Sequence, residues 1–119
     1  MFGIGPATRI YLAVEPVDMR KGFDGLYGLV QGRLGQDPLS GHLFLFTNRW
    51  RTRLKVMVWD GTGLWVCAKR LEKGRFAWPQ TDESAIVTMR PEELSMLLSG
   101  IDLSHTRSRR NWFRLEPAA

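Results

Sequence analysis

The sequence has 119 residues, of which 44% are hydrophobic and 24% charged, and its net charge is +5. This length and composition fit one globular domain with its own core and exclude a wholly disordered chain. The single cysteine, Cys67, excludes an internal disulfide framework, so a reducing, cytoplasmic location is expected. No apolar run is long enough to span a membrane, and Arg9 and Glu15 interrupt the first run, which argues against a secretory signal.

The charge is distributed unevenly along the chain. Residues 42–79 hold eight basic and two acidic groups, residues 80–104 hold one and five, and residues 105–119 hold four and one. A basic block in a cytoplasmic protein points to a polyanionic partner, above all nucleic acid. The alternative is that the acidic block neutralises the basic blocks within the molecule.

The first elements predicted along the chain are a strand and a helix. The run RIYLAVE at 9–15, closed by Pro16, is typical of a short strand. In the segment VDMRKGFDGLYGLVQGRLG, apolar residues recur at helical spacing, with Asp18 as the candidate N-cap and Gly35 at the end. Glycines at 22, 25, 28 and 32 share the other side of this helix. Either another backbone approaches them closely or that side faces water.

The middle of the chain predicts an antiparallel meander. HLFLFTN at 42–48 is apolar on both faces, as in a central strand, and strands at 53–59, 64–70 and 75–78 follow, joined by turns at DGTG and EKG. A short strand is expected at 85–88 and a helix at PEELSMLLSG. The predicted fold is therefore α+β, an antiparallel β-meander sheet packed by two helices. It comprises one domain over residues 1–104 and a basic, aromatic tail over 105–119.

Hairpin geometry assigns the side chains of the meander to two faces. If DGTG forms the first turn, Arg53 lies opposite Arg70, and if EKG forms the second, Arg70 lies opposite Phe76. Directly paired residues share a face. One face is therefore basic and aromatic, with Arg53, Lys55, Met57, Trp59, Arg70, Phe76 and Trp78. The other is the better core, with Leu54, Val56, Val58, Trp65, Cys67 and Ala77, and with Lys69 and Arg75 at its margins.

The basic and aromatic face has the composition of a surface that binds nucleic acid, because bases stack on rings while phosphates meet cations. Two directly opposed arginines favour an anion between them, either a phosphate or a carboxylate from residues 82–93. The predicted aromatic platform is Trp59, Phe76 and Trp78, with burial under the helix as the alternative. The candidate nucleic-acid-binding residues are Arg49, Arg51, Arg53, Lys55, Lys69, Arg70, Arg75, Arg107, Arg109 and Arg110.

No motif for catalysis or metal binding is evident in the sequence. The two histidines and Cys67 are isolated and make no zinc-binding set. If the protein were a metal-dependent nuclease, its carboxylate cluster would have to be formed by Asp18, Asp24 and Asp60. Each has a structural explanation instead, as a helix cap, an exposed helix residue and a turn former. We therefore expect no enzyme activity, catalytic residue, metal or cofactor.

Four long blocks of the sequence resemble one protein family. They are PVDMRKGFDGL, DPLSGHLFLFTNR, KVMVWDGTGLWVCAKRLEKGRFAWP and ELSMLLSGIDL, in order and nearly without gaps over residues 8–113. The family is TnpB, the small product of the second reading frame of insertion-sequence-sixty-six-type transposons, unrelated to the RNA-guided nuclease of the same name. The resemblance implies an accessory factor that acts in transposition beside a separate, larger transposase. It carries no catalytic residue over to this chain.

Two hypotheses for the function remain open at the level of the sequence. In the first, the protein binds element DNA through the basic and aromatic face, the arginine-rich loop at 49–51 and the tail. In the second, it is a protein–protein adaptor that docks on the transposase or on another copy of itself without touching DNA. The aromatic platform or the glycine side of the helix would then form the contact.

Overall fold

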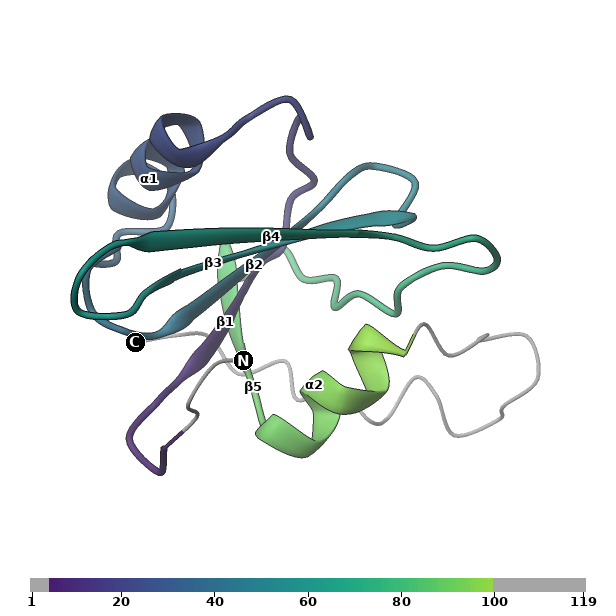
Figure 1. The fold of residues 1–119 in the computed structure, drawn as a ribbon. Helices are drawn as coiled ribbons and strands as arrows, with labels where there is room; N and C mark the ends of the chain where they lie inside the picture. Colours follow the sequence, from purple (N-terminus) through teal and green to yellow (C-terminus); the bar gives the residue numbers. More distant parts are fainter. Residues whose placement is uncertain (1–4, 100–119) are drawn as a thin grey trace.

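The computed structural model describes residues 5–99, which form a five-stranded sheet with one helix on each side (Figure 1). In chain order the elements are β1 (Ile10–Ala13), α1 (Phe23–Gly32), β2 (Leu43–Thr47), β3 (Arg53–Trp59), β4 (Leu64–Arg70), β5 (Ile86–Met89) and α2 (Pro91–Leu98). The strand order is β4-β3-β2-β1-β5. The predicted α+β class, with two helices packed on a sheet, is confirmed.

The meander of β2, β3 and β4 is antiparallel, as predicted. Its register follows the DGTG hairpin, because Arg53 pairs with Arg70 and Trp59 pairs with Leu64. Asp60 holds the turn through its carboxylate, which accepts hydrogen bonds from two backbone N–H groups of the turn at 2.8 and 2.9 Å. A short polar side chain that satisfies its own turn in this way fixes the hairpin locally.

The sheet is mixed, since β1 adds a parallel pair to the meander. Ile10 of β1 pairs with Leu43 of β2 in the parallel sense and with Met89 of β5 in the antiparallel sense. Two parallel neighbours require a crossover connection, which residues 14–42 supply together with α1. The chain after β4 then passes to the far edge of the sheet, where it forms β5.

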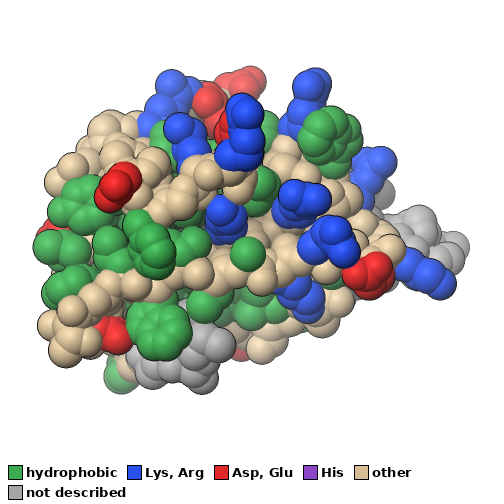
Figure 2. Space-filling view, turned by 45° about the horizontal axis from the view of Figure 1, so that its top comes forward, with side chains coloured by type: hydrophobic (Ala, Val, Ile, Leu, Met, Phe, Trp, Pro, Cys, Tyr) green, Lys and Arg blue, Asp and Glu red, His purple; other side chains and the backbone are tan. Residues whose placement is uncertain are grey.

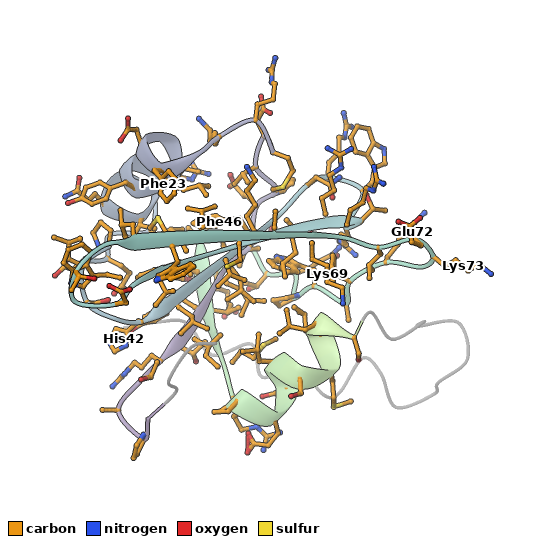
Figure 3. All side chains as sticks on the ribbon, viewed as in Figure 1. Phe23, His42, Phe46, Lys69, Glu72 and Lys73 are labelled. Atoms are coloured by element: carbon orange, nitrogen blue, oxygen red, sulfur yellow. The ribbon has the colours of Figure 1, made fainter. Side chains whose placement is uncertain are left out.

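Both faces of the sheet are covered. Phe44, Phe46 and Met57 are fully buried on the α1 side, where Figure 3 shows Phe46 between α1 and the sheet. Leu54 and Val56 are buried on the other side, in the same cluster as residues of α2. Burial on both faces explains why β2 is apolar at successive positions and does not alternate.

The last strand of the predicted meander is wrong, because residues 75–78 form no strand. Phe76 and Trp78 lie on the α2 side of the sheet, where they are 0% and 6% exposed. The Trp78 indole N–H donates to the carbonyl of Ala13 at 2.8 Å, which ties the segment to β1. Burying two large rings outweighs the hydrogen bonds of one more short strand. The prediction that these rings share the face of Arg53 is therefore also wrong.

The helix α1 begins at Phe23 and not at the predicted cap, Asp18. The Asp18 carboxylate instead accepts the backbone N–H of Arg20 at 2.9 Å and pairs with its guanidinium at 2.6 Å. This compact turn satisfies Asp18 before the helix starts, so its predicted role as N-cap is wrong, and Gly22 takes that position. Residues 17–21 thereby form a short arm, with a turn at Met19 and Arg20, that leads into α1.

Most of the glycine side of α1 faces open space in the described part of the chain. A Cβ atom added at Gly28 or Gly32 would meet no heavy atom within 4 Å. The buried side of the helix is formed by Leu26 and Val30, which pack on the sheet. Within residues 5–99, Gly28 and Gly32 are therefore not required by close contact with another segment, whereas a Cβ atom at Gly25 would lie 3.1 Å from the Lys21 side chain.

Candidate nucleic-acid interface

The helix α1 covers only part of its face of the sheet. Met57 lies beneath it in a common buried cluster, whereas Arg53 and Arg70 lie beyond it at the other end of β3 and β4. Both arginines are exposed. Figure 2 shows this division, with Lys and Arg gathered over one half of the face and hydrophobic side chains over the other. The uncovered half carries the cations of the central strands.

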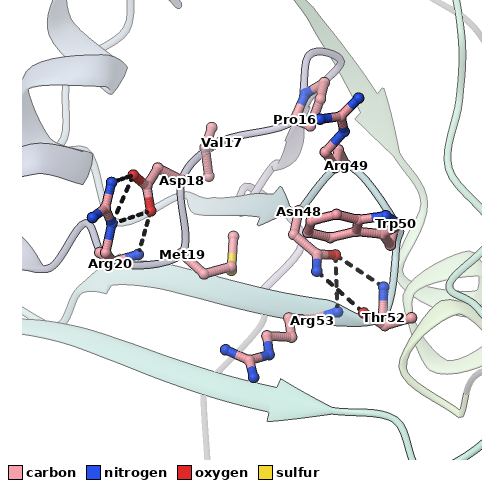
Figure 4. A pocket seen from close by; sticks show the side chains of 10 residues that line it. All are labelled: Pro16, Val17, Asp18, Met19, Arg20, Asn48, Arg49, Trp50, Thr52 and Arg53. Carbon is pink, nitrogen blue, oxygen red and sulfur yellow. Dashed lines mark hydrogen bonds and ion pairs between the residues drawn. The ribbon is translucent and has the colours of Figure 1, made fainter.

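Two adjoining hollows in this half form one surface, which we call the basic groove. The first lies between residues 16–20 and residues 48–53 (Figure 4), and the second runs along β3 and β4. Both are lined by Met19 and Arg53, so the hollows are continuous. The cations lining the groove are Arg20, Arg49, Arg53, Lys55, Lys69 and Arg70, and its carboxylates are Asp18 and Glu72.

Carboxylates of the described chain do not neutralise the centre of the groove. Arg70 lies 3.8 Å from Glu72, but these side chains are 66% and 86% exposed, and such a pair contributes little. Within residues 5–99, Arg49 and Arg53 have no carboxylate at ion-pair distance, and the acidic groups at 82–93 do not reach them. Internal neutralisation by residues 82–93, the alternative raised by the sequence, is absent from this part of the chain.

The opposition of Arg53 and Arg70 gives the groove its strongest electrostatic feature. The two residues pair directly across β3 and β4, and like charges at such positions destabilise a sheet. Lys55 follows on the same face, and its ammonium donates to the backbone carbonyl of Lys21 at 2.7 Å. This bond leaves the positive charge of Lys55 uncompensated. An anion bound here would meet three cations from two neighbouring strands.

The loop between β2 and β3 presents an aromatic ring beside the groove. Asn48 is 8% exposed, and its side-chain oxygen accepts the backbone N–H groups of Thr52 at 2.9 Å and Arg53 at 3.1 Å. These bonds order the loop without using the residues at its tip. Trp50 is consequently 64% exposed, and the Arg49 guanidinium carbon lies 5.5 Å from the centroid of its ring.

Sequence reasoning missed Trp50, although a signal was present. In NRWRT a large aromatic residue stands between two arginines, in a short connection between two strands. A loop of this kind runs over the surface and offers no core for the ring to enter. The aromatic partner of the cations is therefore supplied by Trp50 in this structure, while the predicted platform residues Phe76 and Trp78 are buried.

Several predicted residues lie away from the groove or only at its margin. Arg51 has a left-handed backbone (φ 60°), and its side chain lies beside Gln80. Lys69 extends to the α2 side of the sheet (Figure 3), where its ammonium donates to the Leu98 carbonyl at 2.6 Å. A cation at the C-terminal end of a helix is favoured by the helix dipole, so Lys69 has a structural role.

The remaining predicted residues are dispersed. Trp59 is partly exposed at the DGTG end of the face, and Arg75 is exposed after β4 without lining the groove. Arg107, Arg109 and Arg110 lie outside the described residues, as does the predicted tail at 105–119. The structure thus brings together Arg49, Arg53, Lys55 and Arg70, with Trp50 and Arg20 beside them.

The carboxylates considered for a nuclease serve separate parts of the fold. Asp18 pairs with Arg20, Asp24 lies in the first turn of α1, and Asp60 holds the β3–β4 turn. Among residues 5–99, no three His, Cys, Asp or Glu side chains are grouped to hold a metal ion. In the same span, no helix has the length and apolar character needed to cross a membrane.

Comparison with known proteins extends the resemblance found in the sequence. The family model described as "IS66 Orf2 like protein" matches residues 8–108. The "Uncharacterized protein y4hO" of Sinorhizobium fredii (strain NBRC 101917 / NGR234) is 44% identical over 105 residues, which cover 88% of this chain and 90% of that protein. The "Uncharacterized protein y4jC" of the same strain is 38% identical over 107 residues, or 90% and 91% of the two chains. No solved structure matches the chain.

The matched span includes every described element of the fold and the whole basic groove. The family predicted from the sequence blocks is therefore confirmed. Because the match covers well over half of the chain, this protein belongs to the IS66 Orf2-like family, the transposition-associated accessory proteins of insertion sequences.

Proposed function

We propose that this accessory protein binds the DNA of its own element through the basic groove. The observation that carries the proposal is the direct pairing of Arg53 with Arg70 on an exposed face. Among residues 5–99, the one carboxylate at ion-pair distance from either arginine is Glu72, which is solvated and 3.8 Å from Arg70. A phosphate between the two guanidinium groups would turn their repulsion into attraction. Arg49 and Lys55 extend the positive surface on either side, along the path of a nucleic-acid backbone.

Trp50 adds a second kind of contact to the groove. Its exposed ring lies beside Arg49, so a phosphate and an unpaired base can be bound side by side. A duplex without distortion offers phosphates to the cations but no free base face to the ring. The arrangement therefore favours DNA with an unpaired or distorted segment over a regular duplex of the same length.

The test is a salt titration of the full-length protein with fluorescent duplex and single-stranded probes from the ends of the element. Engagement of about six phosphates predicts a slope near −5 for log K against log salt on the duplex, and a shallower slope on the single strand. Tighter binding of the single strand at high salt is expected from Trp50, since stacking is less sensitive to ions. A response that does not change with salt would overturn the proposal.

A second candidate function is favoured by a different surface. Phe23 at the start of α1 is 53% exposed, and it lies on the opposite side of the helix from Gly28 and Gly32. We propose, as the alternative, that the Phe23 end of α1 docks on the transposase of the same element as an adaptor. An apolar contact of this kind would survive high salt and would be lost in Phe23→Ser. Loss of the complex with transposase at moderate salt would assign the association to charge instead.

A further inference from the structure

Among residues 5–99, the strand β4 forms an outer edge of the sheet that pairs with no further strand. It is the outermost strand in the order β4-β3-β2-β1-β5, and seven residues long. The helices lie above and below the sheet in Figure 1 and leave this edge uncovered. Natural edge strands are usually short, or carry proline or a bulge that prevents pairing. β4 contains no proline and no glycine, and it pairs with β3 without interruption.

The hydrogen-bond pattern shows which backbone groups face outward. The backbone N–H of Asp60 donates to the Gly63 carbonyl, and the backbone N–H of Leu71 donates to the Thr52 carbonyl. These residues therefore form hydrogen-bonded pairs at the two ends of the β3–β4 ladder. Such pairs alternate along an antiparallel ladder. The backbone N–H and C=O groups of four residues of β4 therefore point away from β3: Leu64, Val66, Ala68 and Arg70. Among residues 5–99, none of these outward groups has a hydrogen-bond partner.

We propose that a second copy of the chain pairs with this edge, β4 to β4 in the antiparallel sense, with a two-fold axis at Cys67. This register overlaps all seven residues of both strands. It sets Leu64 against Arg70 and Val66 against Ala68 of the other copy, so every pair of outward groups forms hydrogen bonds. The result is one continuous sheet made from the five strands of each copy.

The charge of β4 favours antiparallel over parallel pairing with a second copy. Both of its cations, Lys69 and Arg70, lie at one end, and the other end is uncharged. Antiparallel pairing therefore places the basic end of each copy against the uncharged end of the other, whereas parallel pairing would stack like charges. The Lys69 ammonium donates to the Leu98 carbonyl, so its charge is not placed to prevent another strand from pairing with this edge. Trp65, which is 48% exposed, would be covered by the Lys69 stem of the second copy.

The pairing also determines where the two grooves lie. Residues paired across antiparallel strands share a face, so the α1 faces of both copies lie on the same side of the joined sheet. Arg53 and Arg70 of each copy are then presented in the same direction. This inference concerns self-association and does not depend on DNA binding, because its measurements are made without nucleic acid.

The test compares the mass of three full-length proteins by sedimentation equilibrium. Wild type is expected to shift from 13.7 kDa to twice that mass as its concentration rises. Ala68→Pro removes an outward N–H group and leaves the ladder with β3 intact, so it should fold and weaken self-association by more than about tenfold. Ala68→Val keeps the N–H group and should associate like wild type. A wild type that stays at 13.7 kDa, or an Ala68→Pro variant that dimerises equally well, would overturn the proposal.

Oxidative cross-linking checks the register independently. At the two-fold axis, the Cys67 residues of the two copies form a non-hydrogen-bonded pair, with Cα atoms about 4.5 Å apart. This separation lies within the range of disulfides, about 4.4–6.8 Å. Copper-phenanthroline should therefore link wild-type dimers through Cys67 and should link Ala68→Pro much less.

Discussion

Arg53 on β3 and Arg70 on β4 lie directly opposite each other on the part of the sheet that α1 leaves uncovered. Their repulsion destabilises the free protein but prepares the site for an anion. Function and stability are therefore opposed at this pair. Arg53→Gln should weaken DNA binding about tenfold, reduce the salt slope by about 1, and raise the free energy of unfolding by about 0.2–1 kcal/mol.

In Arg53→Gln the affinity for DNA should fall while the free energy of unfolding rises, and this combination makes the prediction specific. Fluorescence anisotropy would give the affinity, and urea unfolding would give the stability. Arg9→Gln is the matched control, because Arg9 is exposed at the start of β1, at the opposite end of the parallel β1–β2 pair from the 48–52 loop. It removes the same charge without touching the groove. Equal losses of affinity in both variants would mean that only net charge matters.

Trp50→Ala should separate stacking from charge. The ring is 64% exposed, so its removal should change the free energy of unfolding by less than about 0.5 kcal/mol. Single-strand binding should fall by about 1–3 kcal/mol per stacked base, and duplex binding should fall much less. Trp50→Phe keeps a stacking face and should retain most of the single-strand affinity. Equal weakening of both probes by Trp50→Ala would contradict a stacking role.

Trp78 should affect folding and not a binding surface. Its indole N–H donates to the Ala13 carbonyl at 2.8 Å, and the ring is 6% exposed. Trp78→Phe leaves that buried carbonyl unpaired and should cost about 1–3 kcal/mol, while Trp78→Ala should cost about 3–5 kcal/mol. Urea unfolding would measure both, with Trp50→Phe as a control near zero. If the Trp78 variants kept the stability of wild type but lost DNA binding, Trp78 would have to be part of the DNA-binding surface.

The contrast between the two turns after β3 shows how far the sequence could predict this site. Asp60 satisfies its own turn, so local residues determined the hairpin and with it the pairing of Arg53 with Arg70. The EKG turn was equally compatible with a hairpin, but the position of Trp78 depends on Ala13, 65 residues away. Local pattern cannot evaluate such a contact. The local pattern therefore places Phe76 and Trp78 on the wrong face. It does not predict the parallel pairing of β1 with β2 for the same reason.

Asp18 provides a variant that should strengthen DNA binding. Its carboxylate lines the groove and holds the Arg20 guanidinium at 2.6 Å. Asp18→Asn removes a negative charge from the groove and releases Arg20 for a phosphate, so affinity at pH 7 should rise several-fold. Glu72→Gln tests the same effect beside Arg70, where the pair is 3.8 Å apart. Weaker binding in Asp18→Asn would show that the order of the arm at 17–21 matters more than its charge.

The same carboxylate should make stability depend on acid pH. Hydrogen bonds from the Arg20 side chain and backbone lower the pKa of Asp18 to about 2, below its value in an unfolded chain, about 3.9. Because the folded pKa is the lower one, the stabilisation is complete above about pH 4 and is lost as the pH falls toward 2. Urea midpoints of wild type and Asp18→Asn should therefore differ at pH 6 and converge near pH 2. High salt should reduce the difference at pH 6, since the pair is exposed. A difference that persists unchanged at pH 2 would assign the effect to the amide's geometry and not to ionisation.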